Sequence, residues 1–190
     1  MEFEIKLAAT PDVFSRIAAD PALGICGDAA ELPMETTYFD TPDGSLSAKK
    51  WMLRRRLEDG VSVVTMKTPG EGRYQRGEWE LPAEEPLAAI PALIARGAPA
   101  ALAAVTALVP VCGAKFLRRA YPLQLCGCRA ELAMDQGTLF RGERSIPLCE
   151  VELECKDGDP AALLALADHL RRAYGLTEEP RSKFARARSL

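Results

Sequence analysis

The sequence has few of the residues that usually build zinc sites, disulfides or nucleophile–base pairs. Its 190 residues include one histidine, His169, and six cysteines, none of which stands in a C-x-x-C pair. This argues against a zinc site, and we expect reduced, mostly buried thiols, as is usual in the cytoplasm. No serine or cysteine has a base partner that the sequence identifies, so no side-chain nucleophile is predicted.

The chain also lacks a strong excess of either charge and any long apolar run. Its net charge is −3, from 24 basic and 27 acidic residues. A protein that bound phosphate polymers by overall electrostatics would be basic, so any polyanion site must be local. No apolar stretch of about 18 residues is present, and the first residues do not resemble a signal peptide. We expect a cytoplasmic protein with no nucleic-acid partner and no membrane partner, and leave open whether it is a monomer or a homodimer.

Charged and apolar residues alternate in the first strand expected from the sequence, Glu2-Phe3-Glu4-Ile5-Lys6. In a β-strand this spacing puts the three charged side chains on one face and the two apolar ones on the other. The alternation returns in residues 78–81, more loosely in 131–135, and in 150–155, where three carboxylates share a face.

Basic residues follow the same rule on other strands. Arg54 and Arg56 share one face, Lys67 lies on the next expected strand, and Arg76 has the parity of Glu78. If every charged face met solvent, the sorting of acids and bases onto separate strands would have no explanation. A closed barrel with the charges inside explains it, with carboxylates on one wall and cations on the other.

Turn and cap signals divide the chain into elements. Asp59-Gly60 predicts a hairpin, Thr10-Pro11-Asp12 begins a helix, and Gly175 ends an amphipathic one. After the first strand, strands are expected at about 34–41, 51–58, 61–68, 74–81, 114–122, 125–135 and 146–155. Helices are expected at about 11–19, 87–96, 98–108 and 160–174.

We expect one domain, residues 1–190, of the α+β class. The alanine-rich segment of about 82–114 is interpreted as a helical insertion packed outside the barrel, because its leucines and isoleucines need burial. With charges inside, the apolar faces of the strands must point outward, where the helices would cover them. The predicted fold is an eight-stranded antiparallel β-barrel, a tunnel with a charged lumen covered by outer helices.

The predicted lumen combines many carboxylates with many cations. Ionised carboxylates at this density need positive charge among them, and oxygen-only donors favour Mg²⁺ or Mn²⁺. Arginine and lysine suit phosphate oxygens, so the set would support phosphoryl transfer with a metal-activated water as the nucleophile. The carboxylates are Glu2, Glu4, Glu78, Glu80, Glu131, Asp135, Glu150, Glu152 and Glu154. The cations are Lys6, Arg54, Arg56, Lys67, Arg76, Arg118 and Lys183.

An ordered series of motifs resembles the signature of the CYTH superfamily, the triphosphate tunnel metalloenzymes, whose fold is an eight-stranded antiparallel tunnel. The resemblance runs nearly end to end and is strongest to the bacterial inorganic triphosphatases. The first motif is the N-terminal E-x-E-x-K of Glu2, Glu4 and Lys6. The others, in family order, are Tyr38-Phe39-Asp40-Thr41-Pro42, Leu53-Arg54-Arg55-Arg56, Thr65-Met66-Lys67, Gln75-Arg76-Gly77-Glu78-Trp79-Glu80, Ala133-Met134-Asp135-Gln136-Gly137, Cys149-Glu150-Val151-Glu152-Leu153-Glu154 and Ser182-Lys183.

The resemblance implies roles for these residues. By resemblance, the metal ligands would be Glu2, Glu4, Glu150 and Glu152, and Asp135 would complete the tunnel. The alternation of side chains adds Glu78, Glu80 and Glu154 to the candidate metal ligands. The triphosphate would be held by Lys6, Arg54, Arg56, Lys67, Arg118 and Lys183, to which alternation adds Arg76. The predicted catalytic residues are Glu4, Lys67 and Tyr38.

Three of these assignments carry alternatives. Tyr38 could position the attacking water or be a core tyrosine, and both interpretations stay open. Arg55 has outward parity and is expected to be solvated or paired with a helix. In the basic C-terminal tail, the resemblance implies that Lys183 reaches the tunnel, and we expect Arg186 and Arg188 to contribute little; the alternative is a solvated tail.

The resemblance implies metal-dependent hydrolysis of inorganic triphosphate to pyrophosphate and phosphate, with inorganic triphosphate or another small triphosphate as substrate. The alternatives are a thiamine triphosphatase, a class IV adenylyl cyclase or a non-catalytic polyphosphate-binding module. The bacterial enzymes often carry a C-terminal helical CHAD domain of presumed polyphosphate-binding role. That domain would begin where this sequence ends, so a stand-alone enzyme and part of a longer protein are both open.

Overall fold

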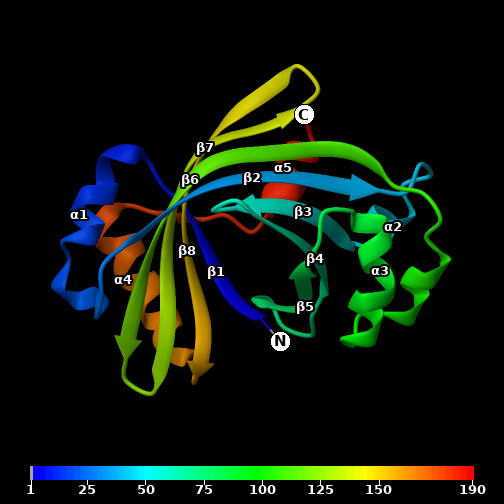
Figure 1. Ribbon diagram of the computed structural model, residues 1–190. Coiled ribbons are helices and arrows are strands. Elements are labelled where there is room, and N and C mark those ends of the chain that lie inside the picture. Colours follow the sequence, from blue (N-terminus) through cyan, green and yellow to red (C-terminus); the bar gives the residue numbers. More distant parts are fainter. Residues whose placement is uncertain (1) are drawn as a thin grey trace.

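A computed structural model describes residues 2–190 of the chain. It is dominated by one antiparallel sheet in the strand order β5-β4-β3-β2-β6-β7-β8-β1-β9. Because β5 also pairs with β1, strands β1 to β8 close into a barrel, and β9 is added beside β1. The predicted eight-stranded barrel is therefore confirmed (Figure 1). The strands are β1 Glu2–Ala8, β2 Ala30–Asp40, β3 Met52–Glu58, β4 Val61–Pro69, β5 Gln75–Pro82, β6 Val109–Leu125, β7 Cys128–Arg141, β8 Arg144–Gly158 and β9 Thr177–Glu178.

Three consecutive strands, β6 to β8, are longer than the sequence predicts. They span 17, 14 and 15 residues and form two hairpins whose turns contain Gly127 and Gly142, both with left-handed backbone (φ 72° and 58°). Glycine adopts this conformation without steric cost, so each turn is tight and the strands pair along almost their whole length. The expected strand ends at 122 and 135 were too early, since β6 continues to Leu125 and β7 to Arg141.

The insertion outside the barrel is shorter than expected. It contains α3 (Pro86–Ala95) and the 3-10 turn η3 (Ala100–Ala104), and residues from Val109 onward already belong to β6. The prediction of a helix over 98–108 was wrong. Pro99 lies directly before η3 and the backbone is already extended at Val105 (φ −77°, ψ 114°), so only a short 3-10 turn forms between them.

Helices cover the outward apolar faces of the barrel, as predicted. Helices α1 (Phe14–Ala18) and α4 (Ala161–Tyr174) lie together on one side, and α3 lies on another (Figure 1). Ile5, Leu132 and Val151 are buried in the core beneath α1 and α4. Leu53, Val64 and Met66 are buried beneath α3 and η3. Among residues 2–190, no helix is long and apolar enough to cross a membrane.

The C-terminal tail is a helix, α5 (Lys183–Arg188), and not a solvated end. Its N-cap is Ser182, whose hydroxyl accepts a hydrogen bond from the backbone N–H of Ala185 at 3.1 Å. Phe184 and Ala187 pack against apolar residues of β2, β6, β7 and β8. These include Tyr38 and Phe116, which line the barrel interior, so α5 packs against the inner faces of these strands.

The β6–β7 pairing depends on a close backbone approach at Gly137. This residue lies opposite Phe116 in the ladder. A Cβ atom there would overlap the carbonyl oxygen of Lys115 and the Cα of Phe116. Because both neighbours are backbone atoms of a paired strand, neither can move aside without disturbing the ladder.

We therefore predict that Gly137→Ala destabilises the barrel by about 1–3 kcal/mol, the usual cost of forcing an extra carbon into a packed site. The exposed neighbour Gln136 provides the control, and Gln136→Ala should change the free energy of unfolding by less than about 0.5 kcal/mol. Urea denaturation of both variants checks this. Equal free energies for Gly137→Ala and the unsubstituted protein would contradict the register of β6 and β7.

Candidate functional site

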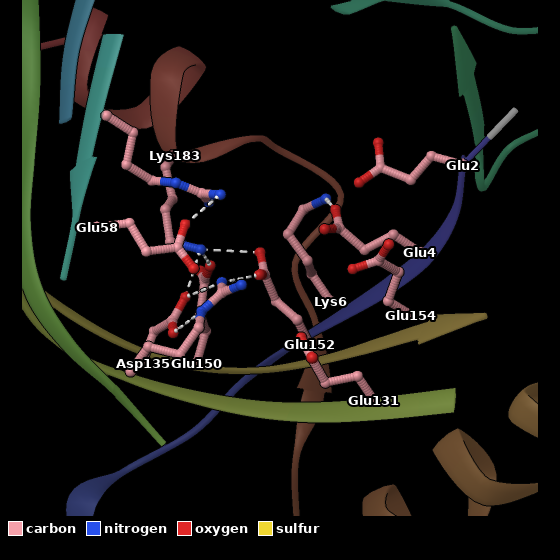
Figure 2. A network of polar contacts seen from close by, with 12 residues as sticks. Glu2, Glu4, Lys6, Glu58, Glu131, Asp135, Glu150, Glu152, Glu154 and Lys183 are labelled. Atoms are coloured by element: carbon pink, nitrogen blue, oxygen red, sulfur yellow. Dashed lines mark hydrogen bonds and ion pairs between the residues drawn. The ribbon is translucent and has the colours of Figure 1, made fainter. Parts of the chain in front are cut away.

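The barrel encloses a cavity of about 290 Å³ lined mainly by charged side chains. Fourteen of the sixteen residues predicted as site residues line it; the other two, Asp135 and Glu150, are fully buried beneath it. The structure therefore brings the predicted residues together, as Figure 2 shows for the acidic side chains. Those that line the cavity are Glu2, Glu4, Lys6, Tyr38, Arg54, Arg56, Lys67, Arg76, Glu78, Glu80, Arg118, Glu152, Glu154 and Lys183.

One group of charges joins β1, β3, β4 and β5. Lys67 Nζ lies 2.6 and 2.7 Å from the two carboxylate oxygens of Glu2 and 3.1 Å from Glu78 Oε1. Arg54 lies 3.9 Å from the same Glu78 oxygen. Burial raises the pKa of Glu2 to about 7, partly offset by Lys67. Burial alone would lower the pKa of Lys67, but Glu4, Glu2 and Glu78 hold it above its ordinary value.

A second group lies where β1 pairs with β8. Lys6 Nζ donates to Glu4 Oε1 at 2.8 Å, and Lys156 Nζ donates to Glu154 Oε2 at 2.7 Å and lies 3.7 Å from Glu131. Burial raises the pKa of Glu154, with Lys156 opposing the shift. Burial and the nearby Glu152 would also raise the pKa of Glu4, yet Lys6 and Lys67 hold it below its ordinary value.

The third group, which we call the buried triad, consists of Asp135, Glu150 and Glu152. Lys183 Nζ lies 2.7 Å from Asp135 and 2.8 Å from Glu152, and it also pairs with Glu150. An ammonium group has three hydrogens, so Lys183 can give one to each carboxylate. Figure 2 shows this convergence of side chains from β7, β8 and the C-terminal segment.

Two arginines also form ion pairs with the carboxylates of the buried triad. Arg118 Nε and Nη2 donate to the two oxygens of Asp135 at 2.8 and 2.7 Å, and Arg118 also pairs with Glu152. Arg186 of α5 pairs with Glu150. Although burial opposes it, Lys183 and Arg118 hold the pKa of Glu152 well below its ordinary value, whereas burial raises the pKa of Glu150.

The carboxylates of the cavity suit a hard divalent cation, because all their donors are oxygen. In the buried triad, one oxygen of each carboxylate lies within 4.8 Å of the others, so this cluster could hold a metal ion. Lys183 already places an ammonium group among these oxygens. Glu2, Glu4, Glu78, Glu80 and Glu154 face the cavity itself and are the carboxylates that an ion in the cavity would reach first.

Arg54 and Arg56 lie side by side on the inner face of β3. Within residues 2–190, the buried Nε of each has no hydrogen-bond partner. Burial and the charge of Arg54 lower the pKa of Arg56 to about 10. The intervening Arg55 does not line the cavity and donates to the carbonyl of Glu84 outside, at 3.4 Å. Two adjacent buried guanidinium groups with unused donors form a site that an oxyanion would fill.

Tyr38 lies at the junction between the cavity and α5. Its side chain is 2% exposed, lines the cavity and packs against the ring of Phe184 with centroids 5.2 Å apart. Burial raises the pKa of Tyr38. The geometry is compatible with both roles that the sequence left open.

Three charged residues were missed as site residues by the sequence analysis. Lys156 lines the cavity and has the parity of Glu150, Glu152 and Glu154, so the alternation could have identified it. Glu58 has the parity of Arg56 and pairs with it at 2.7 Å. The prediction for Arg186 was wrong: its side chain is 9% exposed and reaches the buried triad. Its i, i+3 spacing from Lys183 puts both residues on one helix face, which was the available signal.

Comparison with known proteins agrees with the motifs and the barrel. The family model for the CYTH domain matches residues 1–187. An inorganic triphosphatase of Haemophilus influenzae is 30% identical over 172 residues, which cover 89% of this chain and 49% of that protein. The chain thus spans about half the length of this relative.

Solved structures have the same fold at lower identity. A putative adenylyl cyclase from Hippeastrum, described as having a dominant triphosphatase activity, matches with a TM-score of 0.68 and 21% identity. The match covers all of this chain and 96% of that one. A protein from Pyrococcus horikoshii matches with a TM-score of 0.65 and 20% identity, over 97% of both chains. With the family model covering nearly the whole chain, the protein belongs to the CYTH domain family.

Proposed function

We propose that the protein is a metal-dependent hydrolase of inorganic triphosphate, which it cleaves to pyrophosphate and phosphate inside the barrel. The observation that carries the proposal is the pair of buried arginines, Arg54 and Arg56, with unused donors in a cavity that also holds many carboxylates. A cavity that only bound polyphosphate would need the cations alone. The similarity to an inorganic triphosphatase supports the same substrate class.

In this proposal the basic residues bind and orient the phosphates. Arg54 and Arg56 offer guanidinium donors to phosphate oxygens, and Lys6, Lys67 and Arg76 add positive charge from facing strands. Fixing the substrate against these groups lowers the entropic part of the barrier and stabilises charge that develops on the phosphate oxygens.

The carboxylates facing the cavity would hold the metal, Mg²⁺ or Mn²⁺, which supplies charge neutralisation and a more acidic bound water. Glu2, Glu4, Glu78, Glu80, Glu152 and Glu154 are placed for this role. Asp135 and Glu150 lie beneath them and orient Lys183. We propose that the carboxylate of Glu4 accepts a proton and that Lys67 holds Glu2 and Glu78 in place.

A cytoplasmic location, a homodimer and a following CHAD domain stay predictions.

We predict that tripolyphosphate is hydrolysed only with a divalent cation, because the ionised carboxylates otherwise repel the substrate. Phosphate release should be measured for tripolyphosphate, thiamine triphosphate and ATP, each with Mg²⁺, with Mn²⁺ and with excess EDTA. We expect tripolyphosphate to have the highest kcat/KM. Undiminished turnover in EDTA would refute the metal dependence, and a preference for thiamine triphosphate or ATP would refute the substrate assignment.

The position of the three consecutive arginines gives a second prediction. Arg54→Ala or Arg56→Ala should weaken substrate binding by about 1.5–3 kcal/mol, roughly ten- to a hundred-fold, because each removes a charge-assisted phosphate contact. Arg55→Ala is the matched control and should have little effect, since Arg55 lies outside the cavity. Steady-state kinetics on the three variants check this, and a larger loss in Arg55→Ala than in the other two would refute the site.

The buried triad gives a third prediction. Lys183→Ala and Arg186→Ala should each lower the free energy of unfolding by about 3 kcal/mol or more, because each leaves the three buried carboxylates with two cations in place of three. The control is Arg188→Ala, since Arg188 is 42% exposed and lies 3.8 Å from Asp40. Its loss should cost less than about 1 kcal/mol. Three equal losses in urea denaturation would mean that α5 is not held by these pairs.

A further inference from the structure

A second cavity, of about 820 Å³, lies beside the barrel cavity. Its walls are the end of β4 with the loop leading to β5, residues 67–76, the segment 180–189 that contains α5, and residues just before β3. The two cavities share the lining residues Met52, Lys67, Arg76, Ser182 and Phe184. An anion in either cavity would therefore contact the same two cations, Lys67 and Arg76.

Six basic side chains line this second cavity, and no carboxylate does so among the residues that the structure describes. We call it the basic vestibule. Lys67, Arg73, Arg181 and Arg188 of this lining take part in ion pairs, whereas Lys50 and Arg76 take part in none within residues 2–190. Its basic residues are Lys50, Lys67, Arg73, Arg76, Arg181 and Arg188.

The other four basic residues of the vestibule pair with carboxylates that lie outside its lining, among them Lys67 with Glu2 and Glu78, and Arg188 with Asp40 at 3.8 Å. Arg73 lies 2.9 Å from Glu178, and Arg181 lies 2.9 Å from Glu179. Both arginine side chains are more than 60% exposed, so water screens these pairs and leaves the guanidinium groups able to contact a ligand.

The end of the barrel cavity that lies away from the vestibule is rich in carboxylates. β3 runs from Met52, on the wall shared with the vestibule, to Glu58. β5 likewise runs from Arg76, on the shared wall, to Glu80. Glu131 and Glu154 also line the barrel cavity but not the vestibule. The end away from the vestibule thus has the carboxylates Glu58, Glu80, Glu131 and Glu154 against the cations Arg56 and Lys156, whereas the vestibule lining has no carboxylate among the described residues.

We propose that the basic vestibule is an anion subsite that holds the phosphate groups of an inorganic chain longer than three, while the barrel cavity holds the three phosphates next to the cleavage point. This inference rests on the proposed function. Lysine and arginine without carboxylates among them bind phosphate oxygens and repel cations. The vestibule therefore favours a further phosphate over a cationic group at the end of a triphosphate, such as the thiazolium ring of thiamine triphosphate.

The test compares phosphate chains of different length in a vestibule whose positive charge is reduced. Lys50→Glu/Arg181→Glu changes two exposed residues to which the proposed catalytic function assigns no role. Linear tetraphosphate, tripolyphosphate and thiamine triphosphate should be compared by kcat/KM with Mg²⁺. We expect the ratio of tetraphosphate to tripolyphosphate to fall about ten-fold, and thiamine triphosphate to be used better, because the net charge of the vestibule lining falls from +6 to +2. Lys115→Glu, on a lysine 74% exposed on β6, is the control and should leave the ratio unchanged.

An unchanged ratio in the double variant, or an equal loss for all three substrates, would overturn the vestibule while leaving the proposed function intact. A wild-type protein without tripolyphosphate turnover would instead overturn the proposed function. In that case, calorimetric titration of tetraphosphate in EDTA still tests the vestibule. We expect binding to the wild-type protein and to Lys115→Glu, and binding about ten-fold weaker in the double variant. Equal affinities in all three proteins would overturn the vestibule.

Discussion

Every carboxylate that points into the barrel must be matched by a nearby positive charge, because an ionised group removed from water without a partner costs several kcal/mol. The inner faces meet this constraint with ion pairs within one strand or between strands that lie close together in the sheet: Lys67 with Glu2 and Glu78, Lys6 with Glu4, and Arg118 with Asp135 and Glu152. The apolar faces are then left to the outside, where α1, α3 and α4 cover them. Because the charged residues lie inside the barrel and the apolar ones outside, the interior needs ion pairs and the exterior needs helices packed against it.

Positive and negative charges are not paired equally well throughout the barrel interior, and the groups that lack partners are the ones suited to bind a ligand. In the buried triad, three carboxylates meet three cations, and this group fixes α5 to the strands. On β3, by contrast, Arg54 and Arg56 keep donors without partners among the described residues. A cation bound to the carboxylates that face the cavity would reduce their repulsion of an anion. An anion bound to the two arginines would likewise reduce their repulsion of a cation. We therefore expect the binding of the two ions to be linked.

The alternation of side chains allowed much of this arrangement to be predicted from the sequence, because a strand has a strict period of two and one register decides the face of every residue. That rule placed Arg54 and Arg56 inside and Arg55 outside, as the structure does. It could not place α5, since a six-residue helix has little stability of its own and forms here through contacts with strands far away in the sequence. Arg186 was misjudged for the same reason: its burial depends on Glu150, which is 36 residues away.

The central claim is that the cations and carboxylates of the cavity bind an anion and a divalent cation together. Calorimetric titration of a hydrolysis-resistant imido analogue of tripolyphosphate, with and without Mg²⁺, tests it most directly. The account predicts that Mg²⁺ strengthens binding by at least about ten-fold, a coupling free energy of roughly 1.4 kcal/mol or more. An affinity that is unchanged or weakened by Mg²⁺ would contradict it.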